Sequence, residues 1–108
     1  MLIILAELQV RDFEAFERFE SLAIKVMAKY GGELISAFET QRQANTGVEI
    51  HLLSFPSTEA FEQYRADGEL AALRNLREIA IEGTTLTFSE TPKEYRSESK
   101  GARSKGSE

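Results

Sequence analysis

The sequence predicts one α+β domain in which strands and helices alternate as βαββαβ. Two junctions carry this prediction. In "KYGGELISAFET" a helix ends at Gly31-Gly32 and a strand follows, and in "IHLLSFPSTEAFEQYR" a strand ends at Pro56 and a second helix follows. The length of 108 residues is that of one ordinary domain.

The first strand and the first helix have distinct apolar patterns. Leu2 to Gln9 is a nearly continuous apolar run, which is typical of a central strand covered on both faces. Asp12 then provides a helix cap, because its carboxylate can accept hydrogen bonds from the free amides of a first turn. Spacings of three and four predict one apolar stripe of an amphipathic helix, made of Phe13, Phe16, Phe19, Ala23, Val26, Met27 and Tyr30.

The second half of the chain repeats the alternation. Strands are expected over 34–40 and 48–55, joined by a hairpin loop over "QRQANTG". Ser57 or Thr58 is expected to cap the second helix, which should break at Asp67-Gly68. A last strand is expected over 84–89. Residues 91–108 are polar, so we expect a domain over 1–90 and a disordered tail.

Composition narrows the function classes. The net charge is −5 and the acidic excess lies in residues 1–90, which disfavours binding to nucleic acid. No cysteine is present, so disulfides, thiolate catalysis and zinc–thiolate sites are excluded. The apolar start is too short for a membrane span, and we expect a cytoplasmic protein. No phosphate loop or metal-ligand spacing occurs, so we expect no cofactor and no metal.

Right-handed crossovers should place both helices on one side of a four-stranded antiparallel sheet, which is the ferredoxin-like arrangement. We assign the purer apolar alternating sets, such as Val48, Ile50 and Leu52, to the helix side. The opposite face then carries Ile3, Leu5, Glu7, His51, Leu53, Phe55, Thr85 and Thr87. Because this face is too apolar for open water and too polar for a sealed core, it predicts a homodimer interface or a ligand cavity.

The chain resembles domain-of-unknown-function family 1330 within the dimeric α+β barrel superfamily. The matching segments are "KYGGELI", "FPSTEAFEQYRADGEL" and "LRNLREIAIEG", and the resemblance covers about residues 2–90. It implies a homodimer in which two sheets pair as a barrel, and it implies no particular activity. The wider superfamily includes cofactor-independent monooxygenases, haem proteins and isomerases. The single histidine has no counterpart among the haem ligands of that superfamily.

A few residues could carry chemistry. His51 is the only side chain whose ordinary pKa lies near neutrality, so it is the candidate general base. Glu7 is expected on a neighbouring strand and on the same face, where it could orient the imidazole. Tyr64 could reach a cavity mouth and Arg77 could bind an anion. A hydrogen-bonded histidine in an interface and solvated helix charges are the structural alternatives.

Three functions are compatible with these features. The first is a homodimer that binds a small organic molecule, with Leu5, Leu53, Phe55, Thr85, Thr87, Tyr64 and Arg77 as ligand-binding residues. The second is a cofactor-independent monooxygenase or isomerase in which His51 and Glu7 are catalytic. The third is a structural interaction module without a cavity.

Overall fold

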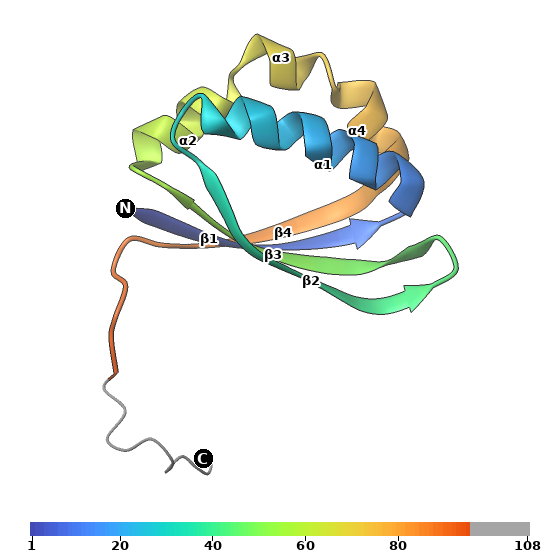
Figure 1. Ribbon diagram of the computed structural model, residues 1–108, viewed down its shortest axis with the longest axis horizontal. Helices are drawn as coiled ribbons and strands as arrows, with labels where there is room; N and C mark the ends of the chain where they lie inside the picture. Colours follow the sequence, from blue (N-terminus) through green and yellow to red (C-terminus); the bar gives the residue numbers. More distant parts are fainter. Residues whose placement is uncertain (96–108) are drawn as a thin grey trace.

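The computed structural model describes residues 1–95, which form a four-stranded antiparallel sheet with all helices on one side (Figure 1). The strand order is β2-β3-β1-β4. The strands are β1 (Leu2–Val10), β2 (Glu33–Gln43), β3 (Thr46–Phe55) and β4 (Ile81–Ser89), and the helices are α1 (Phe13–Ala28), α2 (Thr58–Arg65), α3 (Gly68–Ala71) and α4 (Arg74–Ala80). The predicted ferredoxin-like α+β fold is confirmed.

Helix α1 begins where the sequence predicts. The Ala15 amide donates to the Asp12 carboxylate over 3.1 Å, and the Asn45 side-chain amide donates to the same oxygen over 2.8 Å. The cap therefore also ties the β2–β3 turn to the start of α1. The predicted apolar stripe is buried against the sheet, apart from a half-buried Tyr30.

The two glycines after α1 have separate roles. Gly31 takes a φ of +76°, a left-handed conformation that glycine adopts without a steric penalty. Gly32 makes room for a ring: a Cβ atom there would lie 2.5 Å from Cε2 and 2.7 Å from Cζ of Phe55. The chain can therefore pass directly over the Phe55 side chain as it enters β2.

The β2–β3 hairpin is longer than predicted. The segment expected as a loop, 41–47, is mostly strand, and only Ala44 and Asn45 separate β2 from β3. The register shifts between Thr40 and Gln43, and Gln41 and Ala44 have a φ of 55°. Polar strand residues are tolerated because residues 41–46 are exposed to solvent.

The crossover from β3 to β4 is divided into three short helices. Ser57, and not Thr58, caps α2, with the Ala60 amide donating to its hydroxyl over 3.1 Å. The chain breaks after α2 as predicted, because Asp67 caps α3 through the Glu69 amide. Asp67 also accepts hydrogen bonds from Lys29 and Tyr30, which lower its pKa. These bonds fix α3 above the end of α1.

The register of β1 and β3 corrects one prediction. Leu2 lies opposite Phe55, Ile4 opposite Leu53 and Ala6 opposite His51, and directly paired residues share a side of the sheet. His51, Leu53 and Phe55 therefore face the helices, and their assignment to the uncovered face is wrong. Both alternating sets of β3 are largely apolar. Choosing the purer apolar set for the helix side therefore exchanged the two faces of this strand.

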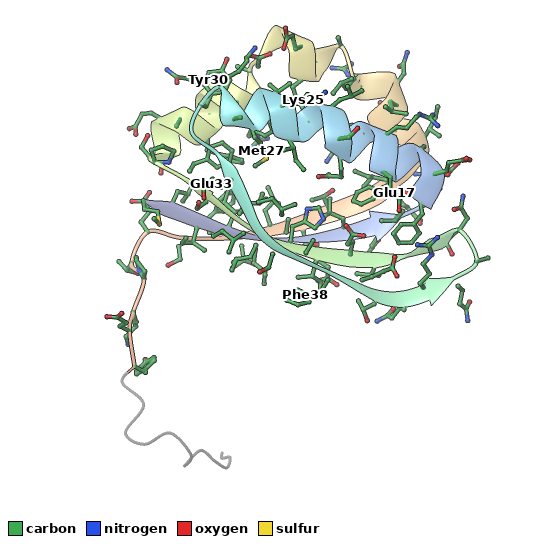
Figure 2. All side chains as sticks on the ribbon, viewed as in Figure 1. Glu17, Lys25, Met27, Tyr30, Glu33 and Phe38 are labelled. Carbon is green, nitrogen blue, oxygen red and sulfur yellow. The ribbon has the colours of Figure 1, made fainter. Side chains whose placement is uncertain are left out.

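The uncovered side of the sheet is the surface we call the open face. It carries Leu5, Glu7, Thr85 and Thr87, as predicted, together with Phe38, Val48, Ile50 and Leu52. Phe38 is 62% exposed and points away from the helices (Figure 2). Glu7 lies opposite Ile50 and Thr85, so its carboxylate is surrounded by mostly apolar and threonine side chains.

Residues 91–95 form no helix or strand, and the rest of the segment expected to be disordered lies outside the described residues. Within residues 1–95, no helix is both long enough and apolar enough to cross a bilayer.

Candidate functional site

A cavity of about 360 Å³ lies between the helices and the sheet. Its apolar wall comes from β1, α1 and the crossover helices, and Met27 points from α1 toward the sheet (Figure 2). The volume falls within the range of small-molecule sites. The apolar lining consists of Ala6, Leu8, Phe19, Met27, Leu53, Phe61, Leu70, Ile81 and Leu86, and the polar lining of Glu20, His51, Tyr64, Arg65, Arg77 and Thr84.

A larger hollow of about 470 Å³ lies between α2 and the end of β4. Its lining includes Phe61, Phe88 and Glu90, and the Glu90 carboxylate accepts a hydrogen bond from Thr58 over 2.5 Å. Its carboxylates are exposed and no histidine lines it. The cavity above β3 is therefore the better candidate for chemistry, because it gathers buried titratable groups.

His51 is the most buried polar side chain of the cavity, with 3% exposure. Its Nε2 lies 2.8 Å from Oε1 of Glu49, two residues earlier on the same side of β3. A carboxylate accepts from an N–H, so this contact assigns the proton of the neutral ring to Nε2. The lone pair of Nδ1 is then available on the other edge of the ring.

Glu20 extends from α1 toward that edge. Its Oε1 lies 3.9 Å from Nδ1 of His51, which is longer than a hydrogen bond. Burial is the main reason why the pKa of Glu20 is raised, and the charge of Glu49 raises it further, while His51 and Arg77 oppose the shift. Glu49, His51 and Glu20 thus form a row in which a carboxylate of raised pKa follows an oriented imidazole.

Tyr64 and Arg77 complete the polar part of the wall. Burial raises the pKa of Tyr64 to about 12, with the charge of Glu20 as a further cause and Arg77 in opposition. The phenol therefore remains a hydrogen-bond donor at neutral pH. Arg77 on α4 donates from Nη2 to the Thr84 hydroxyl over 3.2 Å, which holds the guanidinium beside β4.

The structure separates the residues that the sequence placed together. His51, Leu53, Tyr64 and Arg77 line the cavity, whereas Glu7, Leu5, Thr85 and Thr87 lie on the open face. The expected Glu7–His51 pair is therefore wrong, because the sheet itself lies between the two side chains. Phe55 packs under α2 against Phe61 and Tyr64, at centroid distances of 5.3 and 5.5 Å, and does not line the cavity.

Sequence reasoning missed Glu20 and Glu49. Glu20 lies four residues after Phe16 and three before Ala23, so it interrupts the apolar stripe of α1. A carboxylate at that spacing was a signal for a polar group facing the core. Glu49 precedes His51 by two residues, so strand alternation alone places the two on one side.

The chain belongs to the family Domain of unknown function (DUF1330), whose profile matches residues 2–91. No curated protein sequence matches it. Within residues 1–95, no group of three or more His, Asp or Glu side chains is arranged to hold a metal ion.

Solved structures share the fold at low sequence identity. A protein of unknown function from Rhodopseudomonas palustris, RPA0582, has a TM-score of 0.69 and 16% identity over 86% of this chain and 84% of its own. Atu4242 from Agrobacterium tumefaciens has a TM-score of 0.66 and 16% identity over 85% and 94%. SnoaB from Streptomyces nogalater, a cofactor-independent oxygenase, has a TM-score of 0.61 and 11% identity over 86% and 94%. These likenesses show the fold alone.

Proposed function

We propose that this protein binds a small planar organic molecule in the cavity between the helices and the sheet. The observation that carries the proposal is the row Glu49–His51–Glu20, of which His51 and Glu20 line a cavity with a largely apolar wall and a few further polar groups. Burying a polar group costs free energy unless the group is hydrogen-bonded, and a ligand can supply a partner that the protein lacks. Aromatic and aliphatic walls with a few convergent polar groups are typical of small-molecule sites.

Binding can be measured with the fluorescent neutral probe N-phenylnaphthylamine. We expect saturable binding by the wild type and its loss in Leu86→Trp, because Leu86 lines the cavity, is 36% exposed and lies opposite Ala6 on the helix side. Phe38→Ser removes apolar surface from the open face and should leave the probe affinity unchanged. If Phe38→Ser abolished probe binding and Leu86→Trp did not, the probe would lie on the open face and the proposal would be contradicted.

A specific observation also favours catalysis of proton transfer. The Glu49 carboxylate orients His51 so that Nδ1 carries the lone pair, which is the arrangement that a general base requires. A ligand with an acidic C–H could lose its proton to Nδ1, and the Tyr64 hydroxyl could donate to the enolate oxygen. A cofactor-independent oxygenase, SnoaB, has the same fold, so this fold is compatible with catalysis without a cofactor.

Deuterium exchange tests the base without a known substrate. Benzoylacetone in D₂O should lose its central C–H proton to His51 and regain a solvent deuteron from the same nitrogen. His51→Gln retains an N–H donor for Glu49 but no base, so the enzyme-catalysed exchange should fall by about 100-fold. Glu7→Gln lies on the opposite side of the sheet and serves as the control. Equal exchange by wild type and His51→Gln would rule out the general base.

We also propose that the protein forms a homodimer through the open face. Phe38 is 62% exposed and Leu5 46% exposed, and both lie beside Ile50 and Leu52. A contiguous apolar surface of this kind on a small domain is typical of an interface. In a dimer with a two-fold axis, each of these residues would be buried once in each protomer. Two-fold symmetry is the commonest arrangement of soluble dimers.

Phe38→Asp tests the interface by native mass spectrometry and sedimentation. Losing about 2 kcal/mol of apolar burial in each protomer should weaken dimerisation by roughly a thousand-fold. Ile79→Asp is the matched control, because Ile79 is 54% exposed on α4, away from the open face. Dissociation by Ile79→Asp but not by Phe38→Asp would place the interface on the helices.

A further inference from the structure

Two arginines line the cavity of a protein that is acidic as a whole. Arg65 ends α2 and Arg77 lies in α4, so the two guanidinium groups come from different helices of the crossover. The net charge of the chain is −5, yet the only carboxylate that lines the cavity is Glu20. The cavity is therefore locally positive within an acidic surface.

The direct contacts of these two arginines are with uncharged groups. Within residues 1–95, neither guanidinium has a carboxylate oxygen within 4.0 Å, whereas Arg42 pairs with Glu39 over 2.8 Å. Arg77 donates to a neutral hydroxyl on Thr84. Arg65 lies over the ring of Phe61, with 5.5 Å between Cζ and the ring centroid. That contact holds the charge beside an aromatic wall of the cavity.

We propose that the ligand of this cavity is a small organic anion, in which an aromatic or unsaturated body carries a carboxylate or a chemically similar group. The inference rests on the proposed function, since it names the class of molecule that the cavity takes. Phe19, Phe61 and Tyr64 provide the surface for the planar body. Arg65 and Arg77 provide the charge-assisted hydrogen bonds that a carboxylate accepts, and arginine suits the planar oxyanion geometry.

A matched pair of probes separates charge from shape. Anilinonaphthalene sulfonate has the skeleton of N-phenylnaphthylamine with one added sulfonate, so the difference between their Kd values isolates the anion. We expect the sulfonate to bind about tenfold or more tightly. Its affinity should fall as salt is raised, while the affinity of the neutral probe should not.

Charge-removing variants assign the preference to residues. Arg65→Gln with Arg77→Gln should weaken the sulfonate by about tenfold or more and leave the neutral probe within about twofold. Arg74→Gln removes the same charge from an exposed residue of α4 that does not line the cavity, and both Kd values should remain as in the wild type. Circular dichroism and native mass spectrometry show whether each variant keeps its fold and assembly.

The outcomes distinguish this inference from the proposed function. Equal affinity of the wild type for the two probes, or equal weakening by Arg74→Gln and the double variant, would overturn the anion preference while leaving the cavity as a binding site. If Leu86→Trp kept the wild-type affinity for both probes, the cavity would not be their binding site, and the proposed function would be wrong. The inference would be supported if the double variant, and not Arg74→Gln, bound the sulfonate probe more weakly while its affinity for the neutral probe stayed the same.

Discussion

The contact between Gly32 and Phe55 permits a quantitative test of the packing under α2. A Cβ atom at Gly32 would lie 2.5, 2.7 and 3.0 Å from Cε2, Cζ and Cδ2 of Phe55, and the ring is 1% exposed, so it has little room to move. Gly32→Ala should therefore destabilise the protein by about 1–3 kcal/mol through overpacking. Because the φ of Gly32 is not left-handed, backbone strain should add nothing to this cost.

A double-mutant cycle isolates that contact. Phe55→Leu removes Cε2 and Cζ, the two nearest atoms, and should cost about 1–3 kcal/mol by itself because a buried ring is lost. In the Phe55→Leu background, Gly32→Ala should cost at least about 1 kcal/mol less than in the wild type. The free energies come from urea unfolding at one fixed protomer concentration, since assembly would otherwise change the midpoint.

The control uses a glycine that touches nothing. A Cβ atom at Gly68, the first residue of α3, would meet no atom within 4 Å, so Gly68→Ala should be neutral or should stabilise by about 0.5–1 kcal/mol. Additivity of Gly32→Ala and Phe55→Leu within about 0.5 kcal/mol would show that the close approach is absent in solution.

Two further predictions concern Glu20 and the cap of α2. Since burial raises the folded-state pKa of Glu20 above its ordinary value of 4.5, the folded state binds more protons there, and stability is lost as the pH rises through the folded-state pKa. Glu20→Gln should therefore raise the urea midpoint at pH 8, and the gain should vanish at pH values below 4.5; an equal gain at both pH values would contradict the burial argument. Ser57→Ala should cost about 1 kcal/mol of unfolding free energy because it removes the cap. Thr58→Ala, which loses only an exposed hydrogen bond to Glu90, should stay within about 0.5 kcal/mol, and the reverse order would assign the cap to Thr58.

The order of the elements could be predicted because its signals are local. Asp12 and Ser57 cap their helices through amides three residues away, and Gly31 ends α1 through its own φ. The break at Asp67 is equally local, since the Glu69 amide lies two residues away. Signals of this kind depend only on neighbouring residues, so one sequence suffices to find them.

The candidate site could be predicted only in part, because it depends on pairing across the sheet. The choice of face for His51 rests on whether Ala6 or Glu7 lies opposite it, and a shift of one residue exchanges the two. From the sequence, the imidazole of His51 was expected on the uncovered side of the sheet. The structure instead places His51 under the helices, where Glu49 accepts a hydrogen bond from its Nε2 and Glu20 lies 3.9 Å from its Nδ1. Glu20 reaches His51 only through the packing of α1 on the sheet. The sequence of β3 alone therefore could not reveal this neighbouring carboxylate.

The division of the β3–β4 crossover into three short helices has a consequence for how the cavity could change over evolution. The imidazole and its carboxylates belong to β3 and to the long helix α1, whereas the two cavity arginines belong to α2 and α4. In the proposed function, ligand selectivity and proton transfer would thus depend on different segments of the chain. Substitutions or insertions around α3 would then change which molecules enter the cavity while His51, Glu49 and Glu20 keep their positions. On this proposal, relatives with different ligands could retain the same imidazole and carboxylates, and relatives that lose those groups could still bind a ligand.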